Sequence, residues 1–183
     1  MVDRTKQRAG QRVSVAYPID EIANAVVLIG YPHHKVHDGD MFQVSYYDNA
    51  VADDANVTFL VRVGAKPAHM TFAGSVGGDA EALMYENPAI SNIGTSLAEW
   101  CMNRVANKIP ETTVFHTPTA TNDGAEMHAS FVPGGAHPTQ APGGSARAGT
   151  EWILAPDTDY LIRIINRAGS EQEISLVVQW YED

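Results

Sequence analysis

The sequence contains a single cysteine, Cys101, in 183 residues. A disulfide between two cysteines of this sequence is therefore impossible, and a metal site built from several thiolates is excluded as well. This pattern is typical of a protein made in a reducing compartment, where disulfides are rare. We interpret Cys101 as a buried, unreactive side chain, because no motif of a catalytic cysteine surrounds it.

Long apolar runs are also missing from the sequence. No stretch approaches the ~18 consecutive apolar residues that a membrane-spanning helix needs, and the apolar segment 23–30 is too short. The first residues are charged, and neither an apolar core nor a cleavage site follows them, so we expect no secretion signal. We therefore expect no membrane partner.

Positive charge is scarce, with 12 Lys and Arg residues against 22 Asp and Glu residues and a formal net charge of −10. Such an acidic body argues against nucleic-acid binding as the main task. The charge is uneven, however. Residues 1–12 carry Arg4, Lys6, Arg8 and Arg12 and a net charge of +3, which leaves −13 for the remainder. This basic arm predicts docking on an acidic surface, and a solvated, frayed terminus is the alternative.

Instead, much of the sequence shows the alternation of apolar and polar residues that is typical of β-strands. A hydrophobic fraction of 44% over this length suits about one domain with a real core. Apolar and polar residues alternate with a period of two, between turns, at 42–46, 57–63, 68–72, 80–84, 112–116, 127–131, 151–154, 160–164 and 174–180. Strands of this spacing predict an all-β fold, an antiparallel β-sandwich of jelly-roll-like form.

The last two of these segments are apolar on both faces. Leu161, Ile165, Val177 and Tyr181 lie on the faces that would otherwise be polar. Two-sided apolarity is typical of strands in the centre of a sheet, or of a face that is buried in an assembly.

The N-terminal part has no such period. Residues 1–18 predict an extended arm, and residues 19–183 predict a single β-sandwich domain. Within that domain, residues 19–29 predict a short helix with acidic residues in its first turn, and a strand over 25–29 is the alternative. Gly30-Tyr31-Pro32 is expected to end either element.

Two later segments interrupt the strands. In the insertion at 87–110, Ser96 and Glu99 resemble a capping box and predict one or two helical turns. Long insertions in β folds are often functional, and we expect this one to contact another subunit. The segment 133–149 holds three prolines and five glycines and predicts a long exposed loop.

Three of the seven histidines lie close together just before the first clear strand, at His33, His34 and His37. With Asp38 and Asp40 they present the ligand types that zinc, iron or manganese prefers. We favour another interpretation, in which Asp38-Gly39 marks a turn. The imidazoles then bind backbone groups around that turn or lie at a subunit interface.

A cupin-type metalloenzyme remains the alternative for these histidines. Such enzymes offer a His-x-His pair, a Glu a few residues later and a distant histidine. This sequence has His-His-x-x-His without the Glu, and the distant ligand would have to be His69, His116 or His128. Metal binding is therefore not the favoured hypothesis.

Catalytic motifs are poor elsewhere too. Neither a Gly-x-Ser-x-Gly elbow nor a phosphate-binding loop occurs. Asp79, Glu81 and Glu86 lie on one predicted strand, and an acid/base pair of the glycosidase kind among them is an open but disfavoured alternative. We therefore expect no catalytic, cofactor-binding or metal-binding residue.

The three tryptophans have different settings. Trp152 and Trp180 lie in strand patterns, which favours core packing over stacking on sugars. Trp100 lies in the insertion and is the best candidate for an exposed aromatic side chain at an interface.

Several short motifs occur in a fixed order along the chain. They are 33–40, 78–86, 91–96, 103–104, 114–119, 123–124, 149–154, 156–160 and 163–167. In their order and spacing they resemble a family of tailed-bacteriophage head decoration (cement) proteins. The resemblance covers about residues 30–181 and leaves the arm outside.

The resemblance implies a β-sandwich on the outside of a capsid, often trimeric at three-fold positions, without enzymatic activity or a cofactor. It implies the major capsid protein and further copies of the chain as partners. The expected location is the virion exterior, after synthesis in the bacterial cytoplasm. The hypothesis is therefore a structural virion protein that stabilises a shell as an oligomer.

The expected interface residues are Arg4, Lys6, Arg8, Arg12, His33, His34, His37, Trp100, Asn103 and Arg104. Two alternatives stay open. One is a cupin-like, metal-dependent jelly-roll enzyme. The other is a glycan-binding head protein that holds host glycans through the 133–149 loop.

Overall fold

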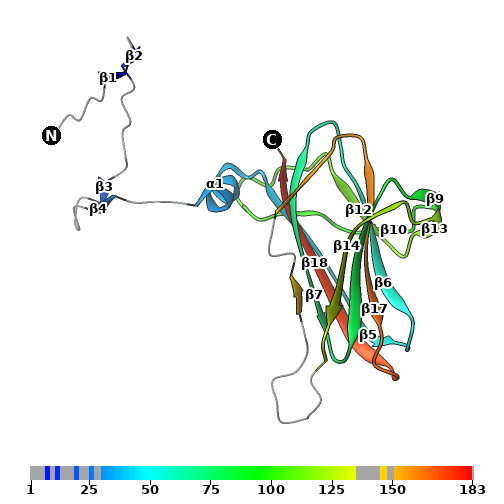
Figure 1. Cartoon of the computed structure of the whole chain (residues 1–183). Helices are drawn as coiled ribbons and strands as arrows, with labels where there is room; N and C mark the ends of the chain where they lie inside the picture. The colour runs from blue at the N-terminus through cyan, green and yellow to red at the C-terminus, as the bar shows by residue number, and fades with distance from the viewer. Residues whose placement is uncertain are drawn as a thin grey trace.

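The computed structural model describes residues 30–134 and 151–182, together with short strand segments at 7–8, 11–12, 19–20, 25–26 and 145–147. Figure 1 shows two antiparallel β-sheets packed face to face, with one short helix at an end of the sandwich. The predicted all-β sandwich is therefore confirmed.

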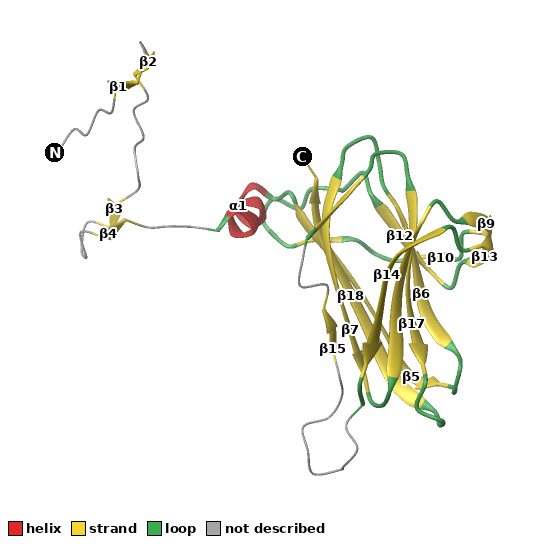
Figure 2. Ribbon diagram, viewed as in Figure 1, coloured by secondary structure: helices red, strands yellow, loops and turns green. Residues whose placement is uncertain are grey.

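The elements follow one another closely along the chain. They are β1 (Gln7–Arg8), β2 (Gln11–Arg12), β3 (Ile19–Asp20), β4 (Ala25–Val26), α1 (Tyr31–Asp38), β5 (Met41–Val51), β6 (Asn56–Arg62), β7 (Ala68–Val76), β8 (Ala80–Glu86), β9 (Ala89–Asn92), β10 (Thr95–Ser96), β11 (Trp100–Cys101), β12 (Thr113–His116), β13 (Thr119–Asn122), β14 (Ala125–Val132), β15 (Ser145–Arg147), β16 (Trp152–Leu154), β17 (Asp159–Asn166) and β18 (Gln172–Glu182). Figure 2 distinguishes the strands from the loops that join them.

The sheet order shows how the chain folds. One sheet runs β11-β5-β18-β7-β15, with β16 also paired to β7, and the other runs β10-β12-β6-β17-β8-β14. Early and late long strands therefore pair: β5 with β18, β6 with β17, β7 with β15 and β16, and β8 with β14. This is a long antiparallel hairpin wrapped on itself, which is the jelly-roll arrangement.

The two strands predicted to be central occupy that place. β17 lies between β6 and β8, and β18 lies between β5 and β7. Their inner faces supply fully buried side chains such as Ile162 and Trp180, which meet Phe59 of β6 and other apolar residues in one core. Each such side chain stabilises the fold by about 1.5–3 kcal/mol.

Two outer features complete the sandwich. The outermost strands β10 and β11 have two residues each. A small two-stranded sheet, β9 with β13, projects from the loops between the main strands; Figure 1 shows it beside β10. The loop that follows β13 carries Asp123, which binds Arg163 on the outer face of β17 at 2.7 and 2.8 Å.

The predicted helix over 19–29 is wrong. The described residues there form β3 and β4, which pair Ile19 with Val26, so the strand alternative holds for Ala25–Val26 alone. Ile19 and Val26 are β-branched and favour extended backbone. The helix begins instead at Tyr31, within the tripeptide expected to end it, because a proline in the first helical turn sacrifices no hydrogen bond.

The helical turns predicted around the capping-box motif are also wrong. Ser96 lies in β10 and pairs with Phe115, and the Glu99 carboxylate accepts the backbone N–H of Val114 at 3.0 Å. The strand β12 offers these residues cross-strand partners that an isolated helical turn lacks. Tertiary pairing therefore overrides the local helix signal.

Asn166 ties the turn after β17 to the rest of the fold. Its side chain is buried, and its Nδ2 donates to the carbonyl oxygens of Val51 at 2.9 Å and Ser170 at 2.7 Å. Its Oδ1 accepts the N–H of Ala168 at 3.0 Å. One amide thus satisfies three backbone groups from two turns, which a shorter side chain leaves unpaired.

We predict that Asn166→Ala lowers the free energy of unfolding by about 2–3 kcal/mol, because buried carbonyl groups lose their donors. Urea denaturation measures the change. The matched control is Asn122→Ala, since exposed Asn122 makes one side-chain bond, to the N–H of Gly124, and should cost under about 1 kcal/mol. Equal effects of the two substitutions would contradict the prediction.

Candidate interaction surface

The segment between β11 and β12 and the helix α1 lie at the same end of the sandwich (Figure 1). We call residues 100–109 the 100–109 segment. It and α1 contain the six proposed interface residues whose side chains the structure describes, namely His33, His34, His37, Trp100, Asn103 and Arg104. The geometry of this surface is therefore built from these two parts.

The ends of α1 are set by its sequence. Pro32 stands in its first turn, and Gly39 ends it in the left-handed conformation with φ of 78°. The N–H groups of Gly39 and Asp40 return to the carbonyl oxygens of Val36 and Lys35 at 3.1 and 3.0 Å, as in a Schellman motif. The turn predicted at Asp38-Gly39 is confirmed, but it follows a full helix.

Gly39 is needed for a second reason. A Cβ at this position would lie 2.7 Å from the Cβ of Ala106 in the 100–109 segment. Any larger residue would therefore strain the backbone and also push the segment away from the helix.

Aromatic side chains hold α1 against the sandwich. The rings of Tyr31 and Tyr181 meet edge to face, with centroids 5.7 Å apart. The ammonium group of Lys35 lies 5.6 Å from the ring centroid of Tyr181, on whose ring His69 stacks at 4.5 Å. Since Tyr181 belongs to the central strand β18, the helix rests on the most buried part of the sheet.

The exposed face of α1 carries two pairs of side chains one helical turn apart. The Nε2 atoms of His33 and His37 lie 3.0 Å apart, with their rings at 71°. The Nδ1 of His34 lies 2.8 Å from a carboxylate oxygen of Asp38. None of the side chains of α1 is buried, so all four groups face outward.

Strand pairing and a side-chain amide fix the start of the 100–109 segment. Trp100 and Cys101 pair with β5, and the N–H of Met102 continues this pairing to the carbonyl oxygen of Met41 at 2.8 Å. The Nδ2 of Asn103 donates to the carbonyl oxygen of His37 at 2.8 Å. Its Oδ1 accepts the N–H groups of residues 105 and 106 at 3.1 Å each, and so shapes one tight turn.

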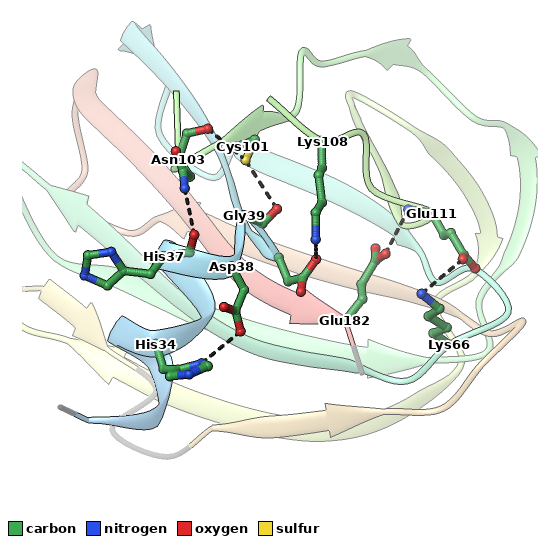
Figure 3. A network of polar contacts seen from close by, with 11 residues as sticks. His34, His37, Asp38, Gly39, Lys66, Cys101, Asn103, Lys108, Glu111 and Glu182 are labelled. Carbon is green, nitrogen blue, oxygen red and sulfur yellow. Dashed lines mark hydrogen bonds and ion pairs between the residues drawn. The ribbon is translucent and has the colours of Figure 1, made fainter. Parts of the chain in front are cut away.

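Charged groups brace the rest of the segment, as Figure 3 shows. The Lys108 ammonium group lies 2.7 Å from the carboxylate of Asp40. The Glu182 carboxylate accepts the N–H groups of Glu111 and Thr112 at 2.9 and 2.7 Å and the indole N–H of Trp180 at 3.2 Å. Charge-assisted bonds of this kind are about twice as strong as neutral ones.

The braced segment presents apolar side chains to solvent. Val105 is 96% exposed, Ile109 90% and Trp100 56%, and Met102 is also exposed. The Arg104 guanidinium lies 4.8 Å from the centroid of the Trp100 ring, a cation–π distance. Exposed apolar residues this close together in sequence make the segment a candidate surface for contact with another macromolecule.

Several predicted roles can be compared with these positions. Trp100 is exposed and Trp180 is buried, as predicted, while Trp152 is partly buried against the core. Cys101 is buried, as predicted, with its Sγ 3.4 Å from the carbonyl oxygen of Gly39.

The arm and the loop can be compared only in part. Arg4 and Lys6 lie outside the described residues, and for Arg8 and Arg12 only the backbone of β1 and β2 is described. The segment 133–149 also lies outside them, except for 133–134 and β15. The proposed roles of both parts therefore stay predictions.

Histidines from different parts of the chain do not converge. His69 binds Glu151 at 2.6 Å, His116 stacks on Tyr46, and His128 lies 3.1 Å from the hydroxyl of Ser130. In the part of the chain that the structure describes, no group of three or more His, Cys, Asp or Glu side chains could hold a metal ion. The described histidines therefore do not assemble the cupin-type centre of the alternative interpretation.

The carboxylates of β8 and the preceding loop each have a partner. Asp79 accepts the N–H of Gly134, Glu81 binds Arg167, and Glu86 accepts the hydroxyl of Tyr160. Burial raises the pKa of the Tyr160 hydroxyl, and Glu86 adds to this rise. The geometry thus uses these groups in pairs that tie strands together rather than as a facing acid/base pair.

The sequence patterns did not predict four residues that contribute to this surface, namely Val105, Ile109, Lys108 and Glu182. Val105 lies in the 87–110 insertion, for which the sequence predicts one or two helical turns. One signal in the sequence could have marked an exposed apolar residue. Ile109 stands directly before Pro110 and belongs to no segment with helical or strand periodicity.

No protein-family model matches the sequence, and no curated protein matches it either. Of the helices in the described residues, none is long and apolar enough to cross a membrane. The residues of this surface are therefore the basis for a proposed function.

The pair Asp123–Arg163 predicts a pH dependence of stability. The hydrogen bonds that Arg163 donates to the Asp123 carboxylate hold the pKa of Asp123 below the ordinary value of 3.8. A carboxyl with a lowered pKa stabilises the fold fully above pH 3.8, and this contribution is lost as the pH falls through the folded-state pKa. Because Asp123 is partly exposed, we expect about 0.5–1 kcal/mol.

Asp123→Asn should therefore lower the free energy of unfolding at pH 7, with the difference from the wild type shrinking as the pH falls below 3.8. Urea denaturation at pH 7 and pH 3 measures both values. Glu171→Gln, at another exposed carboxylate, is the control and should show little difference at either pH. A difference for Asp123→Asn that is constant with pH would refute the ionic origin.

Proposed function

We propose that the protein is a structural virion protein that binds the outer surface of a bacteriophage capsid as an oligomer and stabilises the shell. The observation that carries the proposal is the 100–109 segment, which presents Trp100, Val105 and Ile109 to solvent. The ordered resemblance of residues 30–181 to head decoration proteins supports the same function.

The cost of ordering the segment on binding affects the binding free energy. Burying a flexible loop in an interface costs about 0.5–1.5 kcal/mol for each side chain that becomes ordered. Here Asn103 binds the carbonyl oxygen of His37 near one end of the segment and Lys108 binds Asp40 near the other, so part of this ordering exists before binding. More of the burial of Val105 and Ile109 therefore appears as binding free energy.

Attachment of several such edges at once makes a modest contact strong. Burial of one valine or isoleucine contributes about 1.5–3 kcal/mol, which alone gives weak binding. Linking copies in an oligomer turns the second and third contacts into intramolecular events, which raises overall affinity by a factor of about 10²–10⁴. A shell clamped in this way resists expansion under the internal pressure of packaged DNA.

The charged groups beside the 100–109 segment suit a partner that is bound through specific contacts. Near the segment, Lys108 pairs with Asp40, and the Arg104 guanidinium lies over the ring of Trp100. Paired charges at the rim of an apolar contact fix its register without adding much affinity. This arrangement suits a defined protein surface.

We predict that Val105→Asp with Ile109→Asp weakens binding to empty capsids that lack decoration protein. Each substitution should cost at least about tenfold per chain, because a buried apolar group is replaced by a charge. Co-sedimentation of the purified chain with the capsids gives the affinity, and analytical ultracentrifugation gives the oligomeric state.

The matched control for this experiment is Phe131→Asp. Phe131 is also exposed, at 65%, but lies on β14 of the other sheet. It should leave capsid binding unchanged. Equal binding by the wild type and the double variant would remove the 100–109 segment from the proposed interface.

The basic arm generates a separate prediction. Deleting residues 1–17 should weaken capsid attachment without lowering the thermal stability of the sandwich, because Arg4, Lys6, Arg8 and Arg12 supply the only strongly basic stretch of the sequence. The loss should be larger at low salt, where exposed charges are least screened. Attachment that is unchanged at every salt concentration would show that the arm has no part in it.

A further inference from the structure

The histidine pair on α1 has a geometry that the function proposed above does not use. His33 and His37 are four residues apart on a helix, so their side chains lie on one face. Both are exposed, and their Nε2 atoms are 3.0 Å apart. Without an ion, one Nε2 must carry a hydrogen and donate it to the other.

The distance between these two nitrogens matches the bite of a metal chelate. Imidazole nitrogens lie about 2.0–2.1 Å from zinc. Two of them at angles between 90° and the tetrahedral angle are therefore about 2.9–3.4 Å apart. The spacing of 3.0 Å falls within this range. When an ion binds both Nε2 atoms, the hydrogen of the donor Nε2 moves to the Nδ1 of the same ring, so that both imidazoles stay neutral, and the two exposed rings turn toward the ion.

The helix that carries the pair is held in place, which lowers the cost of ordering the ligands. The carbonyl oxygen of His37 accepts Nδ2 of Asn103 at 2.8 Å. Tyr31, two residues before His33, packs on Tyr181, and the Gly39 turn closes the helix two residues after His37. The two imidazoles are thus presented from a backbone that is fixed at both ends.

We propose that His33 and His37 together bind one divalent transition-metal ion of the zinc, nickel or copper class through their Nε2 atoms. Imidazole suits these ions, whereas magnesium and calcium prefer oxygen ligands. No third protein ligand joins them among the described residues. The remaining coordination positions are therefore open to water or to donors from a second chain, and the site faces the same exterior as the 100–109 segment.

Titration calorimetry of the full chain, without an added histidine tag, tests the site. Zinc chloride should bind with at most one ion per chain, and magnesium chloride should give no binding. His33→Ala and His37→Ala should each weaken zinc binding by at least about tenfold, since even losing a supporting group costs about 10–100-fold. The double variant should be little worse than either single one, because one imidazole cannot chelate.

The matched control is His34→Ala, which removes an equally exposed imidazole that lies on the neighbouring face and binds Asp38. It should bind zinc like the wild type. Circular dichroism of each variant checks that the sandwich is intact. The proposal is overturned if the wild type binds no zinc, or if His33→Ala and His37→Ala bind it as His34→Ala does.

Discussion

Burial of the two central strands is the constraint on which the rest of the structure depends. β17 and β18 are the last strands of the chain, yet each lies between two earlier strands and buries its inner face in the core. The sandwich therefore closes only when the whole chain from β5 onward is present. Late, non-local pairing of this kind is characteristic of slowly folding β proteins.

The same central strand also controls the surface proposed for binding. Trp180 lies in the core, and its indole N–H meets the carboxylate of Glu182, which in turn holds the backbone before β12. Tyr181, between them in sequence, points to the other face and supports α1. Three consecutive residues of β18 thus connect the core, the helix and the backbone that leads into β12.

Features that core burial sets could be predicted from the sequence, and features that pairing with other strands sets could not. The strands, their inner faces and the central position of β17 and β18 could be predicted, because period-two alternation reports directly which side chains are buried. The region 96–105 could not, because its backbone partners come from β12 and β5, far away in sequence. The helix was misplaced because Pro32 was treated as an end signal, although it equally marks a beginning. His33 and His37 were noticed, but only the helix reveals that they face one another.

The very short strands β10 and β11 have a consequence for how copies of this molecule can meet. An unpaired strand edge invites the edge of a neighbouring molecule and can seed filaments. β10 and β11 offer two residues each, and β14 carries an irregularity between Glu126 and His128 that interrupts its pairing. These two edges therefore give a second copy of the chain little backbone to pair with, so any contact there must rest on side chains.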